Sequence, residues 1–190
     1  MLQYKMVKFM EKDILVHTCC GPCAVVFVDG IIKEGYKPFM LWYNPNIHPF
    51  TEYKSRKNAL VDYSDLMGLE VEVHDYYGLR SFVTESISDL SNRCFNCYKN
   101  RLVFVANYAV EKGFEAFSTT LLASPYQNFD LICEEGKKLA QELGLNFIVK
   151  DYRKNFRDGM NKAREMGLYM QKYCGCIFSE EERYLKNGKR

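Results

Sequence analysis

The sequence predicts an α/β fold in which one mostly parallel sheet carries helices on both faces. Short apolar runs rich in β-branched and aromatic residues alternate along the chain with longer segments that have helical periodicity. Strands that alternate with helices are joined by right-handed crossovers, so they should run parallel. The length of 190 residues and the hydrophobic content of 47% fit one domain that spans residues 1–190.

The first half of the chain supplies three predicted strands and two predicted helices. The strands are the apolar runs 14–16, 38–43 and 69–73. The helices are 24–34 and 51–67, which end at Gly35 and Gly68 as helices with glycine C-caps do. Two prolines between 44 and 49 exclude regular structure, so this segment is a predicted loop.

The second half continues the alternation. Helices are predicted at 94–112 and 129–143, each followed by a glycine, and strands at 115–119 and 146–149. The charged segment 179–190 is predicted to be an exposed helix or a frayed end. The order is that of a Rossmann-like, doubly wound sheet, in which ligands bind beyond the carboxyl ends of the strands. That rule brings four segments to one rim: 17–23, 43–48, 74–77 and 119–127.

Charge and hydropathy narrow the class of protein. Lys and Arg number 26 and Asp and Glu 24, so a net charge of +2 gives no global attraction to nucleic acid, and any site for a polyanion must be local. The first residues are charged and lack the apolar core of a secretory signal, and no run approaches the roughly 18 apolar residues of a membrane helix. We therefore expect a soluble cytoplasmic protein whose eight cysteines are metal ligands or redox groups and not disulfides.

Seven of the eight cysteines fall in three short motifs. They are Cys19, Cys20, Cys23, Cys94, Cys97, Cys174 and Cys176. Cys94 and Cys97 open a predicted helix, where positions i and i+3 share a face. Adjacent Cys19 and Cys20 should point in different directions, so they need not serve the same metal atom. Cys133 has no cysteine neighbour and is predicted to be a buried structural residue.

Three interpretations of these motifs are open on spacing alone. Seven thiols exceed the four that one cubane cluster or one structural zinc ion needs, so a zinc site would leave three spare. Cys20 and Cys23 also form the C-x-x-C motif of thiol-disulfide oxidoreductases, although the preceding Cys19 and the longer architecture argue against that class. A binding protein that holds an iron–sulfur cluster or zinc without catalysis is the third.

Together with polar stretches at the same rim, the cysteine motifs resemble the cobalamin-independent epoxyqueuosine reductase family. The matching segments are HTCCGPC at 17–23, YNPNIHP at 43–49, CFNCY at 94–98 with Arg101 and Leu102, STTLLASPY at 118–126 and QKYCGCIFS at 171–179. They follow one another in order over nearly the whole chain. The set is therefore far more specific than any single motif.

The resemblance implies a two-electron deoxygenation of epoxyqueuosine to queuosine in tRNA, the last step of queuosine biosynthesis. It also implies a [4Fe-4S] cluster beside a mononuclear iron, held by the seven cysteines and a carboxylate. Asp75 and Asp151 each follow a predicted strand and are the candidate carboxylates. Electrons must come from an external donor, since no flavin or nicotinamide fingerprint is present.

Side chains at the rim are the candidates for substrate chemistry. His17, Tyr43 and His48 are the predicted proton donors. An anticodon loop is recognised by stacking on aromatic side chains and by basic groups that hold phosphates, and residues 152–173 mix both kinds. The predicted substrate-binding residues are Asn44, Asn46, Tyr53, Arg56, Ser124, Tyr126, Arg153 and Arg157.

Overall fold

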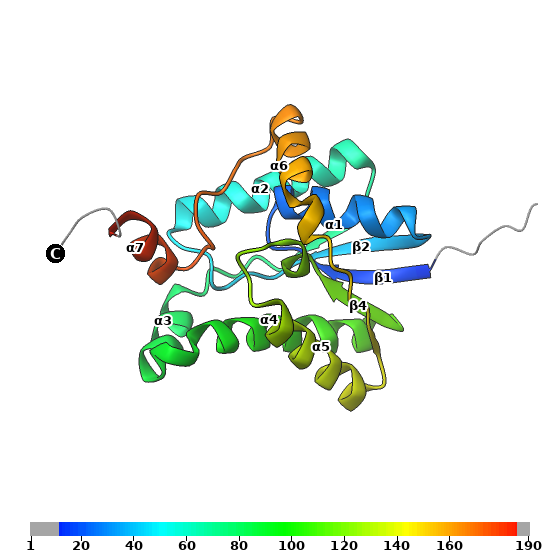
Figure 1. Ribbon diagram of the computed structural model, residues 1–190. Coiled ribbons are helices and arrows are strands. Elements are labelled where there is room, and N and C mark those ends of the chain that lie inside the picture. Colours follow the sequence, from blue (N-terminus) through cyan, green and yellow to red (C-terminus); the bar gives the residue numbers. More distant parts are fainter. Residues whose placement is uncertain (1–11, 186–190) are drawn as a thin grey trace, which may run out of the picture.

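A five-stranded sheet organises the described residues, 12–185, of the computed structural model (Figure 1). The strands are β1 (Lys12–His17), β2 (Tyr36–Trp42), β3 (Val71–Val73), β4 (Ala116–Thr119) and β5 (Asn146–Phe147). Their order is β3-β2-β1-β4-β5, and every pairing is parallel. The predicted fold class is confirmed.

The strand order reverses at β1, which lies at the centre of the sheet. His17, the last residue of β1, pairs with Leu41 of β2 on one side and with Thr119 of β4 on the other. The chain leaves β1 and β4 toward opposite faces, so a crevice opens between their carboxyl ends. The loops that carry the predicted site begin at this switch point.

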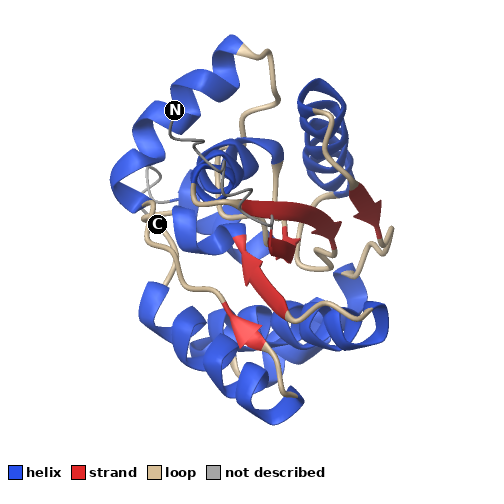
Figure 2. Cartoon of the chain, turned by 90° about the vertical axis from the view of Figure 1, so that its right-hand side faces the viewer, coloured by secondary structure: helices blue, strands red, loops and turns tan. Residues whose placement is uncertain are grey.

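Helices cover both faces of the sheet. The helices α1 (Gly21–Lys33), α2 (Phe50–Met67) and α6 (Phe156–Glu165) pack together on one face, and α4 (Arg93–Lys112) and α5 (Phe129–Leu143) on the other (Figures 1 and 2). The shorter helices α3 (Leu79–Ser88) and α7 (Ile177–Leu185) lie toward the carboxyl ends of the strands (Figure 1). Because both faces are covered, Ile14, Leu15 and Val16 of β1 are fully buried.

The sequence did not predict α3 and α6. The helix α6 is mostly charged and buries only Met160 and Ala163. It packs on α1 through Gly159, where an added Cβ would lie 2.3 Å from Val26 Cγ2, so the contact needs glycine. Tertiary packing, and not apolar periodicity, therefore defines this helix.

Within the described residues there are also three short 3₁₀ turns: η1 (Leu90–Asn92), η2 (Thr120–Ala123) and η3 (Arg153–Asn155). The predicted boundaries are otherwise close, although α1 begins at Gly21 with Pro22 in its first turn and β5 is shorter than predicted. The charged start of the chain and residues 186–190 of the predicted tail lie outside the described residues. Within residues 12–185, no helix combines the length and apolar character needed to cross a membrane.

Candidate metal centre and adjoining pocket

Hydrogen bonds at the switch point hold the loops after β1, β2 and β4 together. His17 Nδ1 lies 2.8 Å from Thr119 Oγ1, and His17 Nε2 lies 3.2 Å from the carbonyl oxygen of Tyr43. The backbone N–H of Cys19 donates to Thr120 Oγ1 at 3.1 Å. The imidazole of His17 therefore joins three strands at the point where the first cysteine motif starts.

The first cysteine group consists of Cys19, Cys20 and Cys23, whose buried sulfur atoms all lie within 4.8 Å of one another. The sulfurs of Cys19 and Cys20 are 3.8 Å apart. The expectation that these neighbours face different directions is wrong. Cys19 sits in a bend after β1 has ended, and Cys20 is the N-cap of α1, so the strand alternation does not apply.

The pKa values of the three thiols are shifted in different directions. Hydrogen bonds from Cys20 and Cys23 hold the pKa of Cys19 well below its usual value. Burial raises the pKa of Cys20, and the hydrogen bond to Cys19 raises that of Cys23. The amide nitrogen of Gln171 lies 3.1 Å from Cys20 Sγ and 3.6 Å from Cys23 Sγ. The first cysteine group thus favours a thiolate at Cys19, with the side-chain amide of Gln171 beside the other two sulfurs.

The second cysteine group consists of Cys94 and Cys97 in the first turn of α4 and Cys174 and Cys176 before α7. Burial raises the pKa of Cys97 to about 12, and the charges of the other three cysteines add to the shift. Burial also raises the pKa of Cys94, and the charges of Cys174 and Cys176 add to that shift. These four thiols therefore lie near enough to influence one another's pKa, although they come from segments 77 or more residues apart. Among residues 12–185, only the first cysteine group has all its sulfurs within 4.8 Å.

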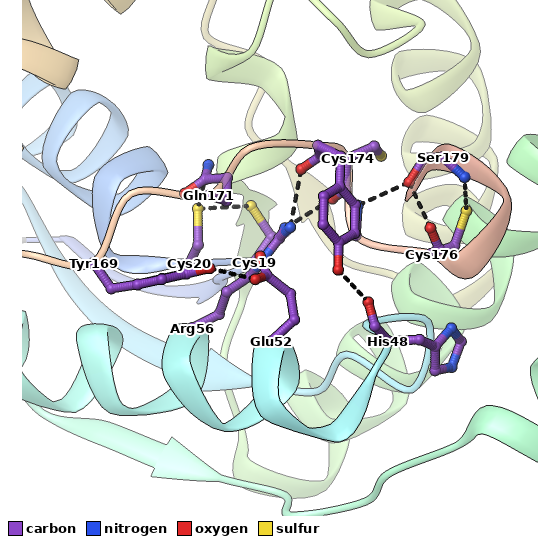
Figure 3. Close-up of polar contacts among 12 residues, drawn as sticks. Cys19, Cys20, His48, Glu52, Arg56, Tyr169, Gln171, Cys174, Cys176 and Ser179 are labelled. Atoms are coloured by element: carbon purple, nitrogen blue, oxygen red, sulfur yellow. Dashed lines mark hydrogen bonds and ion pairs between the residues drawn. The ribbon is translucent and has the colours of Figure 1, made fainter. Parts of the chain in front are cut away.

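A segment that we call the strap, residues 169–176, carries two of these cysteines across the rim (Figure 3). Arg56 of α2 holds it: Nη1 donates to the carbonyl oxygen of Cys174 at 2.8 Å and Nη2 to that of Tyr173 at 2.9 Å. Arg56 Nε also donates to Glu52 Oε1 at 2.6 Å. The hydroxyl of Tyr173 donates to the carbonyl oxygen of His48 at 2.5 Å. The strap is thereby fixed to α2 and to the loop after β2.

A second arginine, Arg101, is buried beside the second cysteine group with 2% of its surface exposed. Its Nε donates to the carbonyl oxygen of Cys97 at 3.0 Å and its Nη2 to Cys97 Sγ at 3.2 Å. Burial lowers the pKa of Arg101, but the nearby sulfurs of Cys97, Cys174 and Cys19 raise it above its ordinary value. The charge of Arg101 therefore interacts with cysteines of both groups.

A small pocket adjoins Arg101. Its wall includes Tyr43, Asn46, Tyr76, Cys97 and Arg101, from the loops after β2 and β3 and from α4. Asn46 is 3% exposed, and its Oδ1 has no hydrogen-bond partner in the described part of the chain. A buried acceptor without a donor is costly unless a ligand or water satisfies it. The wall of the pocket thus contains a buried acceptor that the described residues leave unsatisfied.

Of the three predicted proton donors, Tyr43 alone lines this pocket. Its ring stacks on Phe104 with centroids 3.7 Å apart, and burial raises its pKa. Burial lowers the pKa of His17 and of His48 to about 4, so both are neutral near pH 7. His48 Nε2 lies 3.1 Å from the carbonyl oxygen of Pro45. A catalytic role for these two histidines stays a prediction, while their contacts are those of structural residues.

Two residues predicted to bind substrate are instead buried in α2. Tyr53 is 1% exposed; its hydroxyl accepts from Trp42 Nε1 at 3.2 Å and donates to Asp75 Oδ1 at 2.9 Å. Arg56 is 2% exposed and is used by the strap and Glu52. Both side chains are occupied by contacts within the chain, and a role in substrate binding stays a prediction. Asn44, also fully buried, donates to the carbonyl oxygen of Thr18 at 2.9 Å.

Three of the other predicted substrate-binding residues, Tyr126, Arg153 and Arg157, lie on the surface past β4 and β5, whereas Ser124 is buried. Tyr126 is 81% exposed and meets the ring of Phe156 edge-on at 5.8 Å. The hydroxyl oxygen of Ser124 accepts from the N–H of Tyr126 at 3.3 Å. Arg153 and Arg157 are exposed. Arg157 and Tyr126 are therefore placed where a large ligand can reach them.

Both candidate carboxylates have basic partners. Asp75 accepts from Lys57 Nζ at 2.5 Å, and Asp151 pairs with Arg153 at 2.6 Å. Hydrogen bonds from Lys57 and Arg153, respectively, lower the pKa values of the two carboxyls. A role of either as an iron ligand stays a prediction, since their contacts here are with cations.

Residues that contact the sulfurs were mostly missed. Besides Gln171 and Arg101, they are Thr120, Gln127 and Ser179, which lie 3.3–3.4 Å from the sulfurs of Cys19, Cys174 and Cys176 respectively. Arg101 carried a usable signal, since positions i and i+4 of a helix are neighbours and Cys97 precedes it by four. The others come from distant segments. Cys133 is buried, as predicted.

The donor set fits iron. All eight cysteines are free, and thiolates about 2.3 Å from one tetrahedral metal lie about 3.8 Å apart, which is the separation of the Cys19 and Cys20 sulfurs. Within residues 12–185, Arg101 forms no ion pair with a carboxylate, so its charge is met by sulfur. A buried cation beside four thiols suits an anionic iron–sulfur centre.

Comparisons with known proteins identify the family of this chain. The profile of the family described as "Epoxyqueuosine reductase QueH" matches residues 14–182. Two curated proteins of that name, from Dehalococcoides mccartyi and Thermotoga maritima, are 36% and 33% identical over 178 and 185 residues. The alignments cover 93% of this chain in both cases and 97% and 94% of the relatives.

A solved structure shares the fold. It is described as a predicted subunit of tRNA methyltransferase from Methanocaldococcus jannaschii, and it superposes with a TM-score of 0.59 at 14% identity over 93% of this chain and 87% of that one. At this identity the likeness concerns the fold alone. The family match spans most of the chain and all three cysteine motifs, and the chain belongs to the epoxyqueuosine reductase QueH family.

Proposed function

We propose that this chain is an oxidoreductase that removes the epoxide oxygen of epoxyqueuosine in tRNA and leaves queuosine. Family membership supports the reaction. The observation that carries the proposal is the position of the pocket: its wall includes Cys97 and Arg101, so a ligand in it would lie against the second cysteine group. The reaction needs two electrons and two protons, and the oxygen leaves as water.

We divide the seven cysteines between two iron centres. The sulfurs of the first group lie as close as those around one metal ion, which favours the mononuclear iron there. The four thiols of the second group match the ligand number of a [4Fe-4S] cluster. When bound, the two centres supply electrons one at a time and a Lewis acid for the departing oxygen.

The chain's own residues orient the substrate and exclude water. Tyr43 lines the pocket and, as a phenol with a raised pKa, keeps a proton to donate. Asn46 offers an unsatisfied amide oxygen to a donor on the ligand. Either Asp75 or Asp151 remains the predicted carboxylate ligand of the mononuclear iron, and replacing each with Asn followed by iron analysis tests that assignment.

The partners follow from the reaction. The tRNA anticodon loop is single-stranded, and such loops bind exposed aromatic and basic side chains. Tyr126 is an exposed aromatic residue and Arg157 an exposed basic one, as such binding requires. Tyr126 is also next in sequence to Gln127, which contacts Cys174. Electrons come from an external donor, because the sequence has no nicotinamide or flavin fingerprint.

The burial of the first cysteine group argues against a thiol-disulfide oxidoreductase. Reactive cysteines of that class are partly exposed, whereas Cys20 is 0% and Cys23 is 4% exposed. A binding protein without catalysis would need no pocket against the cluster, so the pocket beside Cys97 favours an enzyme.

Anaerobic reconstitution with iron and sulfide tests the proposal. The reconstituted chain should convert epoxyqueuosine to queuosine in tRNA when a low-potential reductant is present. Cys23→Ser should lower the iron content while the absorbance of the cluster persists, whereas Cys97→Ser should abolish that absorbance. Cys133→Ser is the matched control and should leave both unchanged. A fully loaded chain that leaves epoxyqueuosine intact contradicts the function.

A further inference from the structure

Arg101 differs from every other arginine near the rim in what it contacts. Arg56 is committed to Glu52 and to two carbonyl groups of the strap. Arg93 pairs with Glu182. Arg101 uses two of its five N–H groups, both on Cys97, and it also lines the pocket. Arg101 therefore contacts the second cysteine group and lines the pocket at once.

Another residue of the pocket wall supplies an independent sign of a polar ligand. Asn46 is 3% exposed and presents an amide oxygen without a donor among residues 12–185. Tyr43 and Tyr76 add aromatic surface at the same wall. A ligand group that enters this pocket would meet the tyrosine rings, Asn46 and Arg101.

We propose that Arg101 is a catalytic residue that donates a hydrogen bond to the epoxide oxygen of the substrate as that oxygen leaves. The inference rests on the proposed function and adds to it a residue that holds the reacting atom. Two C–O bonds break and one C=C bond forms. The external donor supplies two electrons, solvent and a protein acid supply two protons, and the oxygen departs as water.

The physical reason is the charge that develops on the oxygen. When the first C–O bond breaks, the oxygen becomes an alkoxide, and a fixed cation in a site with little water stabilises it more than solvent would. The guanidinium of Arg101 keeps its proton, so it assists as a hydrogen-bond donor and not as an acid. The contact with Cys97 fixes its plane before substrate arrives.

The test compares binding of two RNAs that differ in one oxygen. Anticodon stem-loops that carry epoxyqueuosine or queuosine are bound, without reductant, to the reconstituted wild type, Arg101→Gln and Arg101→Lys. We expect the wild type to prefer the oxygen-bearing RNA by about tenfold, as for a hydrogen bond to a charged group. In Arg101→Gln the ratio of the two dissociation constants should fall to about 1, and Arg101→Lys should be intermediate. Arg80→Gln, an exposed arginine of α3, is the matched control for charge and should retain the preference.

Kinetics and iron analysis complete the test. Arg101→Gln should lower kcat by about a hundredfold or more with KM changed only a few-fold, because the contact strengthens in the transition state. Equal discrimination by Arg101→Gln and wild type overturns the proposal. If Arg101→Gln loses iron, the result for Arg101→Lys is used instead. Arg101 belongs to the metal site alone if Arg101→Lys keeps its iron and discriminates between the two RNAs as the wild type does. The same conclusion follows if both variants lose iron. A loaded wild type that fails to deoxygenate the RNA contradicts the proposed function instead.

Discussion

Arg56 allows a prediction of stability that can be worked from its contacts. The guanidinium is 2% exposed and is bonded to Glu52 and to the carbonyl oxygens of Tyr173 and Cys174. Replacing Arg56 with Met leaves a buried carboxylate without its cation and frees the strap. Breaking a buried ion pair from one side costs about 3–5 kcal/mol. That is a large part of the roughly 5–15 kcal/mol by which domains are stable.

Urea unfolding of the metal-free, reduced protein measures this loss. Arg56→Lys should fall between wild type and Arg56→Met, because a single amine cannot replace the planar fork that bonds three groups. Arg157→Met removes an exposed arginine and should stay within about 0.5 kcal/mol of wild type. In the reconstituted protein, Arg56→Met should also release iron faster to a chelator. A loss of unfolding free energy below about 1 kcal/mol in Arg56→Met would refute the reasoning.

Three further outcomes are expected. Cys97→Ala should lose the cluster absorbance while Cys133→Ala keeps it; an unchanged spectrum in the first contradicts the assignment. Replacing Arg153 and Arg157 with Ala should weaken tRNA binding and reduce the slope of log K against log salt by about 1 per lost phosphate contact. Most of this effect should come from Arg157, because Arg153 is paired with Asp151. The free energy of unfolding of the metal-free protein should fall by about 2 kcal/mol between pH 7 and pH 5 because of His48. The pKa of His48 falls from 6.5 to about 4 on folding, so the unfolded chain takes up the proton first as the pH is lowered. Urea unfolding at both pH values should show a smaller difference in His48→Asn.

The sequence predicted the sheet well because strand and helix periods alternate clearly in residues 12–147. Helix α4 was predicted to within one residue at its start, since it has a long apolar stripe and ends at Gly113. Helix α6 was missed because its sequence carries charges and a glycine, and only its contact with α1 makes it stable. No local pattern encodes that contact.

The sequence predicted which cysteines are candidate ligands but not which residues contact their sulfurs. Cysteine motifs are visible in the sequence, but the contact of Gln171 with Cys20 joins residues 151 positions apart. Arg56 and Tyr53 were predicted to bind substrate because they belong to a polar stretch that follows a predicted strand. Together with Leu60 and Tyr63 they recur at intervals of three and four residues, which marks a buried helix face and could have shown their burial.

The assembly of the second cysteine group has a consequence for synthesis of the chain. Its four cysteines come from residues 94–97 and 174–176, so 77 positions separate Cys97 from Cys174. The second pair is synthesised later than the first, so the four thiols can meet only after residues 174–176 have left the ribosome. Until then Cys94 and Cys97 are two reduced thiols open to oxidation, in a chain that already contains the five strands of the described sheet.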